Sequence, residues 1–358
     1  MKKVLKILLI IVLVIIVAVG GLFGFLTVTE FKPADVEDAD NVGDSTAELL
    51  PISASDRDFT ILSWNIGYAG LGAASDFFMD GGTHSMAADK AAVNGYLEGI
   101  RTVCSGDYDF IMLQEVDRNS TRTYKVNEAE ALARGNTVFA LNFSCPFVPN
   151  PNTLIIEPIG KVNSGLLTCS SRSIAKAERI SLPCPFTWPL RVANLKRCLL
   201  VSYIPVEGSD KQLVLVNLHL EAYDSGEGKI AQTKQLREFI KAEYDKGNYV
   251  IAGGDFNQVF PGSLGVYPNT HPDLWQPGEL DGSMLPEGEG WKFAYDSDTP
   301  TCRLLNQPYD PTDSVNTQYY VIDGFILSPN VELKTVETLD LDFANSDHNP
   351  VLLNFALN

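Results

Sequence analysis

Short apolar segments that end in polar or ionisable residues recur along most of this 358-residue chain. The segment Tyr249–Ala252 leads into Asp255 and Asn257, and the last such segment is preceded by Asp347 and His348. A hydrophobic core does not need ionisable side chains at the ends of its strands, whereas a site for a metal ion or a phosphate group does. This pattern constrains the chain to rigid sheets whose strand ends carry a site.

Three further residues fit the same pattern. Asn65 closes a segment that begins at Phe59, Glu115 closes one that begins at Phe110, and His219 lies near the end of Leu213–Leu220. Alone, a terminal Asn is more typical of a turn, and a lone His of a hydrogen-bonded core residue. Their joint occurrence is what indicates a site.

The rest of the pattern predicts many strands and few helices. Helical spacing is found in Met86–Cys104, Glu128–Arg134 and Gly228–Tyr244. Further strands are predicted at Thr137–Phe143, Gly165–Cys169, Cys198–Ile204, Tyr319–Leu327 and Val351–Phe355. This mixture favours one domain of packed β-sheets flanked by helices.

The N-terminus carries a long apolar segment. No charged residue occurs from Ile7 to Thr29, which is long enough for a transmembrane helix of about 20 residues. Lysines precede the segment and acidic residues follow it, so the positive-inside rule predicts a cytoplasmic N-terminus and an exported remainder. The alternative is a cleaved signal peptide, for which Ala18-Val19-Gly20 offers a site, and the protein would then be secreted.

The sequence thus predicts three regions. Residues 1–29 form the transmembrane anchor or signal peptide, residues 30–57 an acidic tether without a sustained period, and residues 58–358 the folded domain. The formal net charge of −18 disfavours strong non-specific binding of polyanions such as duplex DNA. Six cysteines lie beyond the apolar segment, where disulfides and buried free thiols are both possible.

The order of these polar strand ends resembles the endonuclease/exonuclease/phosphatase superfamily, which includes pancreatic-type deoxyribonuclease, abasic-site endonucleases, neutral sphingomyelinases and inositol-polyphosphate 5-phosphatases. The resemblance covers about Phe59 to Leu357. It rests on Ser63-Trp64-Asn65-Ile66, Leu113-Gln114-Glu115-Val116, Asn217-Leu218-His219-Leu220, Gly254-Asp255-Phe256-Asn257 and Ser346-Asp347-His348-Asn349-Pro350, with a sixth motif at Val321-Ile322-Asp323-Gly324. The resemblance implies an α/β (α+β) fold, a deoxyribonuclease I-like four-layer α/β/β/α sandwich, and the apolar N-terminal segment predicts one transmembrane helix before it.

The resemblance also implies a magnesium-dependent hydrolase of phosphate esters, in which Mn²⁺ is possible in place of Mg²⁺. Glu115 is the principal metal ligand that it implies, with Asn65 and Asp347 nearby. Carboxylate and carbonyl oxygens are the ligands that a hard cation such as Mg²⁺ prefers.

The remaining site residues receive catalytic roles from the same resemblance. His348, oriented by Asp323, accepts a proton from the attacking water or contacts the phosphate, and Asp255 is the alternative base. Asn257 and His219 are expected to donate hydrogen bonds to the phosphoryl oxygens. Arg172 is expected to support phosphate binding, although an exposed surface arginine fits the sequence equally well.

The substrate stays open among nucleic acid, phospholipid head groups and inositol phosphates. An abasic-site repair enzyme is disfavoured, because those relatives carry an Asp where this chain has Gly67 and lack a histidine at the position of His219. The insertion Phe260–Gln307, with Trp275 and Trp291, is the candidate specificity element. The non-enzymatic alternative is a catalytically silent, membrane-tethered binding module of the same fold, and the oligomeric state is not determined by the sequence.

Overall fold

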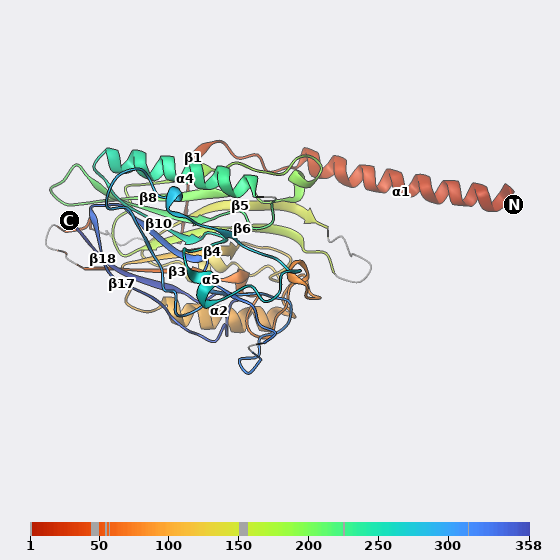
Figure 1. Ribbon diagram of the computed structural model, residues 1–358. Helices are drawn as coiled ribbons and strands as arrows, with labels where there is room; N and C mark the ends of the chain where they lie inside the picture. Colours follow the sequence, from red (N-terminus) through yellow and green to blue (C-terminus); the bar gives the residue numbers. More distant parts are fainter. Residues whose placement is uncertain are drawn as a thin grey trace.

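The structure, a computed structural model, describes residues 2–43, 50–53, 56, 58–149, 157–224, 226–313 and 315–358 (Figure 1). Two seven-stranded mixed sheets form its centre. The first has the order β1 (Val36–Asp38), β7 (Lys176–Ser181), β8 (Cys198–Pro205), β9 (Gln212–His219), β10 (Tyr249–Asp255), β16 (Asp323–Leu327) and β13 (Lys292–Ala294). The second has the order β17 (Val331–Thr338), β18 (Val351–Leu357), β3 (Phe59–Asn65), β4 (Phe110–Asp117), β6 (Gly160–Ser170), β5 (Asn136–Val148) and β2 (Asp40–Val42).

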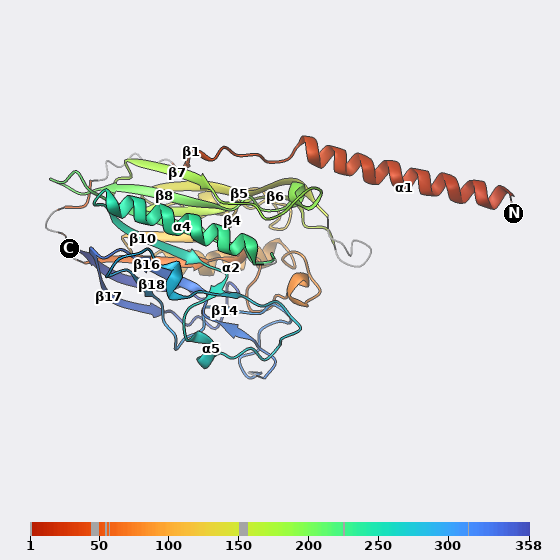
Figure 2. The ribbon, with the colours of Figure 1, turned by 45° about the horizontal axis from the view of Figure 1, so that its top comes forward.

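Helices cover the outer face of each sheet. The helix α4 (Glu227–Asp245) packs on the first sheet, and α2 (Lys90–Cys104) and α3 (Glu128–Leu132) pack on the second (Figures 1 and 2). Alternate residues of each strand face opposite sides. In β3, Ile61 therefore points to the other sheet, whereas Leu62 and Trp64 point to the helices. The four-layer sandwich expected from the sequence is confirmed.

Short elements complete the chain between these layers. They are α5 (Ser263–Val266), the strands β11 (Gln258–Val259), β12 (Gly278–Glu279), β14 (Cys302–Arg303) and β15 (Tyr319–Tyr320), and the 3₁₀ helices η1 (Gly67–Ala69), η2 (Phe78–Asp80), η3 (Leu190–Ala193) and η4 (Gly282–Met284). All six cysteines are free, and five are buried, so the free-thiol alternative holds in this structure.

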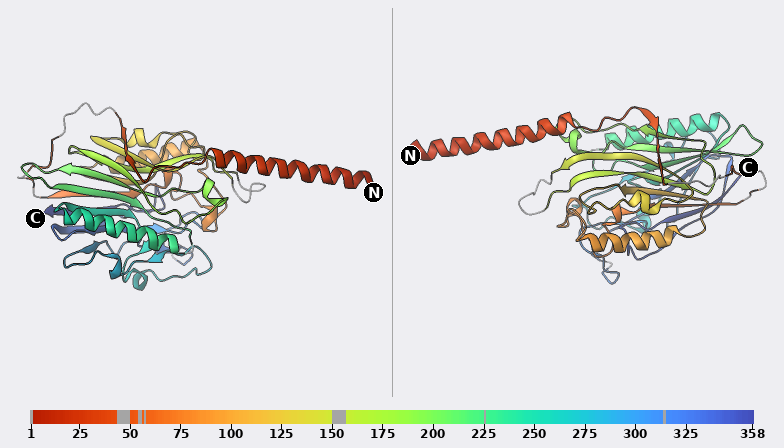
Figure 3. Two further views of the ribbon diagram at one scale, coloured as in Figure 1. Left: turned by 90° about the horizontal axis from the view of Figure 1, so that it is seen from above. Right: turned by 180° about the vertical axis from the view of Figure 1, so that it is seen from behind.

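The N-terminal helix α1 (Lys2–Val28) projects from the domain, away from the C-terminus (Figure 3). Among the described residues it is the one helix long and apolar enough to cross a membrane. A signal sequence can have the same length and composition. Its last turns contact the domain, where Leu26 is buried against Phe143 and Val192.

The segment predicted as a tether differs from expectation where it is described. Val36–Asp38 pairs with β7 and Asp40–Val42 pairs with β5, so this acidic stretch adds an edge strand to each sheet. Residues 44–49, 54, 55 and 57 of the predicted tether lie outside the described residues. Charged side chains are tolerated on edge strands because one side of the strand faces solvent, and the lack of an apolar run therefore concealed these strands.

Candidate active site

Three predicted residues come together because their strands are neighbours in the first sheet. Asp255, at the end of β10, lies opposite His219 at the end of β9 and opposite Asp323 at the start of β16. The β9–β10 pair is parallel and the β10–β16 pair is antiparallel, so all three residues reach the same edge.

The second sheet contributes Asn65 and Glu115 to that edge. Strands β3 and β4 are parallel, and Asn65 lies opposite Gln114. The pairing of β4 with β6 is irregular between Leu113 and Val116, and Glu115 has a positive φ of 55° there. A bulge of this kind redirects a side chain, and here it brings the Glu115 carboxylate to the pocket that Asn65 also lines.

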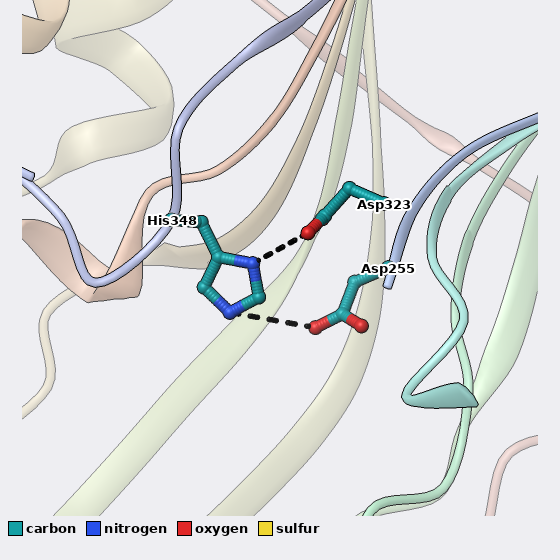
Figure 4. Close-up of side chains that lie close together, drawn as sticks. All are labelled: Asp255, Asp323 and His348. Atoms are coloured by element: carbon teal, nitrogen blue, oxygen red, sulfur yellow. Dashed lines mark hydrogen bonds and ion pairs between the residues drawn. The ribbon is translucent and has the colours of Figure 1, made fainter. Parts of the chain in front are cut away.

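Asp347 and His348 enter from the loop before β18. The imidazole Nδ1 of His348 lies 2.8 Å from Oδ2 of Asp323, and its Nε2 lies 3.8 Å from Oδ2 of Asp255 (Figure 4). Nε2 is also 4.0 Å from Oδ2 of Asp347. His348 thus lies between Asp323, which orients it, and the carboxylates of Asp255 and Asp347.

Asn65 connects the two sheets. Its amide nitrogen donates hydrogen bonds to Oδ2 of Asp255 at 3.0 Å and to Oε1 of Glu115 at 3.3 Å, and its Oδ1 accepts the backbone N–H of Gly67. These hydrogen bonds let Asn65 orient the carboxylates of Asp255 and Glu115. The metal-ligand role that the resemblance implies for Asn65 stays a prediction.

The two groups that could exchange protons have shifted pKa values. Burial and the neighbouring Asp323 charge raise the pKa of Asp255 to about 7. Burial alone would lower the pKa of His348, but the charge of Asp323 and its hydrogen bond raise that pKa well above its ordinary value. At neutral pH the geometry therefore gives a protonated imidazole beside a carboxyl group that is close to its titration midpoint.

His219 and Asn257 also contact Asp255. Nε2 of His219 is 3.4 Å from Oδ2 of Asp255, and burial followed by the charges of Arg197 and His348 lowers the pKa of His219 well below its ordinary value. Asn257, with φ of 51°, donates its backbone N–H to Oδ1 of Asp255 and its side-chain N–H to the carbonyl of Leu220. Both residues line the pocket, as expected for groups that contact a phosphate.

A hard divalent cation fits the oxygen donors of Glu115 and Asp347. Both carboxylates line the pocket, and burial, together with the Glu115 charge, raises the pKa of Asp347 to about 6. Ligand atoms of Asp255, Asp323 and His348 also lie within 4.8 Å of one another. However, the Nδ1 atom of His348 is already hydrogen-bonded to Asp323, and a hard cation prefers oxygen. Glu115 and Asp347 are therefore the better candidate ligands.

Arg172 is not part of this site. It forms ion pairs with Asp56 at 3.1 Å and Asp109 at 3.7 Å. Strand β6 runs antiparallel to β4, and Ser170 at its end lies opposite Phe110 at the start of β4. The expected phosphate contact is wrong because a residue that follows β6 lies at the sheet edge opposite to Glu115.

Other basic residues line the pocket, and the sequence pattern did not reveal them. Arg197 contacts the carbonyl of His219 at 3.4 Å and lies 3.7 Å from Glu221, while Arg122 forms two hydrogen bonds with Asp117. Arg303 donates to four backbone carbonyls. None of these arginines ends an apolar run, so only the tertiary structure places them here.

The pocket has a volume of about 420 Å³. Its lining combines the polar residues described above with aromatic and aliphatic side chains. Trp275, from the insertion Phe260–Gln307, lines the pocket, whereas Trp291 packs against Tyr244 of α4 in the core.

Comparisons with known proteins agree with this architecture. Among solved structures, an endonuclease/exonuclease/phosphatase from Beutenbergia cavernae is similar with 18% identity and a TM-score of 0.52 over 85% of this chain and 72% of that one. One from Bacteroides vulgatus has 16% identity and a TM-score of 0.51, over 85% of this chain and 100% of that one. A search of curated proteins found no match.

The family comparison extends over most of the chain. Residues 62–348 match the sequence profile of the Endonuclease/Exonuclease/phosphatase family. This range begins within β3 and ends at His348, so it contains every residue that the two sheets bring together at the site. A chain with this fold, these carboxylates and this match is a metal-dependent phosphoesterase in general terms, and it belongs to the endonuclease/exonuclease/phosphatase family.

Proposed function

We propose that this protein hydrolyses a phosphate ester by in-line attack of water, with Asp255 as the general base. The observation that carries this assignment is the position of the Asp255 carboxylate between Asn65, His219 and the His348–Asp323 pair. A base works best when its pKa is near the working pH, and the pKa of Asp255 is raised to about 7. The raised pKa of His348 makes this histidine a weaker candidate for the base.

His348 then serves as a cationic hydrogen-bond donor to the phosphate. Its Nδ1–H is held by Asp323, so Nε2 carries the second proton and faces the pocket side of Asp255. His219 and Asn257 add neutral donors around the same point, and such donors stabilise charge that develops on the phosphoryl oxygens. Bound at Glu115 and Asp347, Mg²⁺ would supply further positive charge to the phosphate.

The cellular side of the reaction is part of the proposal. Lysines lie in the first turns of α1, ahead of its apolar run, and the acidic stretch follows the helix, which supports a cytoplasmic N-terminus and an exported catalytic domain anchored by α1.

The test is hydrolysis of bis-p-nitrophenyl phosphate by the full chain, with Mg²⁺, with Mn²⁺ and with EDTA. We expect metal-dependent release of p-nitrophenol and a loss of about 10²–10⁴-fold in rate for Asp255→Asn. His348→Ala and Glu115→Gln should each reduce the rate strongly, whereas Glu238→Gln, on the exposed face of α4, is the matched control for loss of a carboxylate.

Two outcomes would contradict the proposal. An Asp255→Asn variant with the wild-type rate would remove Asp255 from the mechanism. A folded protein that binds phosphate esters but hydrolyses none would favour the binding-module alternative.

A further inference from the structure

Part of the apolar lining of the pocket also packs around the end of the N-terminal helix. Leu26 of α1 is 1% exposed and packs in a cluster with residues of β5, β6 and the loop around η3. Six members of this cluster also line the pocket, namely Phe78, Phe143, Val148, Ile159, Ala193 and Leu195. One layer of side chains therefore separates the end of α1 from the interior of the pocket.

The end of α1 is fixed to the domain by polar contacts as well. The Glu30 carboxylate is 2% exposed and lies 2.9 Å from Arg191 and 3.3 Å from Lys196. The indole N–H of Trp188 donates to the Thr27 hydroxyl at 3.0 Å. These contacts make the apolar segment continuous with the domain, so the membrane surface would lie next to this end of the molecule.

The surface around this end is suited to a lipid interface. Trp188 and Leu190 are 58% and 69% exposed beside the end of α1, and Met79 is 45% exposed at the pocket. Tryptophan is enriched where a protein meets the membrane surface. Figures 1 and 2 show that α1 leaves the domain at the end where the loop 70–85 lies, opposite to the C-terminus.

The acidic residues of the pocket limit the chemistry of the occupant further. The carboxylates of Asp80, Glu115, Glu221, Asp255 and Asp347 line the pocket. A long polyanion would meet this negative charge and an overall charge of −18. A single phosphate ester with an apolar chain would instead place one anionic group at Asp255 and His348 and its chain along the apolar wall.

We propose that the substrate is an amphiphilic phosphate ester of the same membrane, with its phosphate at Asp255 and His348 and its apolar chain against the wall that seats α1. This inference rests on the proposed hydrolase function and on retention of α1 as an anchor. The hydrolysed bond is a P–O bond: the water oxygen bonds to phosphorus and gives a proton to Asp255, while the bond from phosphorus to the leaving oxygen breaks and that oxygen takes a proton from the solvent as the alcohol leaves.

The experiment uses the full chain in a phosphate-free detergent with Mg²⁺ and a series of alkyl p-nitrophenyl phosphates with methyl, butyl and octyl chains. The leaving group is constant, so the chain length is the only variable. We expect kcat/KM to rise at least about tenfold from methyl to octyl, because each buried CH₂ adds to binding. Single-stranded and duplex DNA should be poorer substrates than the octyl ester.

Variants separate the apolar wall from effects of the detergent. Leu195→Asp and, independently, Phe78→Asn, both in this wall, should reduce the octyl-to-methyl ratio of kcat/KM by about fivefold or more. Val266→Asp replaces an exposed apolar residue that does not line the pocket and should leave this ratio unchanged. Thermal melting checks that each variant is folded.

The outcomes distinguish the two proposals. Hydrolysis with equal kcat/KM along the series, a ratio unaffected in both folded wall variants, or faster cleavage of DNA would overturn the lipid inference and leave the hydrolase function standing. No hydrolysis of any ester would remove the proposed function, and the lipid inference with it.

Discussion

At the scale of single residues, the fold buries carboxyl groups of the site, such as Asp255 and Asp347, in surroundings that disfavour their ionised form. We predict a bell-shaped dependence of kcat/KM on pH. The rate rises as Asp255 loses its proton with a pKa of about 7 and falls as His348 loses its proton at a pKa well above its ordinary value. Asp323 raises both pKa values, so Asp323→Asn should shift both limbs to lower pH. A variant profile that superimposes on the wild-type one would show that Asp323 does not tune these groups.

Asp347 gives a prediction on stability at the same scale. Burial raises its pKa from 3.8 to about 6, so above pH 6 the folded state holds an ionised group that it disfavours. This penalty is on the order of 3 kcal/mol and disappears as the pH falls toward 4. In EDTA at pH 8, Asp347→Asn should therefore melt at a higher temperature than the wild type, with a smaller difference at pH 5.

The metal provides the second measurement for Asp347. Added Mg²⁺ should raise the melting temperature of the wild type more than that of Asp347→Asn, because only the wild type keeps both carboxylate ligands. Asp273 is exposed, so Asp273→Asn is the matched control and should show neither effect. An Asp347→Asn variant that is less stable than the wild type in EDTA would contradict the assigned strain.

At the scale of the elements, the turn after β3 positions Asp347. Gly67 has a φ of +50°, and a Cβ added there would lie 2.8 Å from Oδ1 of Asp347. Gly67→Ala should raise the Mg²⁺ concentration for half-maximal activity by about tenfold, as expected when a contact behind a ligand is disturbed. Gly208→Ala is the control, because Gly208 also has a positive φ but no atom within 4 Å of the added Cβ. Equal metal dependence of the two variants would show that backbone strain, not contact with Asp347, matters.

The sequence predicts the central strands well and the edge strands poorly. Strands such as β9 and β10 are buried on both faces and therefore consist of continuous apolar runs that end at site residues. The edge strand β17 alternates charged and apolar residues, and β1 is mostly acidic, so neither has a comparable run. The Arg172 prediction is wrong because the sequence of a strand end does not reveal which edge of the sheet that end reaches. The raised pKa of Asp255 could not be predicted either, because it depends on residues that both sheets bring together.

The edge strands β1 and β2 yield a prediction on the extent of the folded unit. A chain that starts at residue 58 lacks both and leaves β7 and β5 as open edges. Compared with a chain that starts at Glu30, it should melt at least about 3 °C lower and scatter more light on standing. Equal melting temperatures would show that these strands add nothing to the domain.

At the scale of the whole molecule, α1 determines on which side of the membrane the catalytic domain lies and whether the domain stays attached to that membrane. An exported domain held at the membrane by α1 should expose Ser209, which lies on the surface between β8 and β9, to the outside of the cell. In a background with Cys184→Ser, the remaining cysteines are buried, so a Ser209→Cys variant offers one accessible thiol. A membrane-impermeant maleimide should label it in intact cells, whereas Lys3→Cys should be labelled only after permeabilisation. Labelling of Ser209→Cys only after permeabilisation would reverse the proposed topology. A soluble mature protein that lacks residue 3 would identify α1 as a signal peptide, and the lipid inference would then lose its membrane anchor.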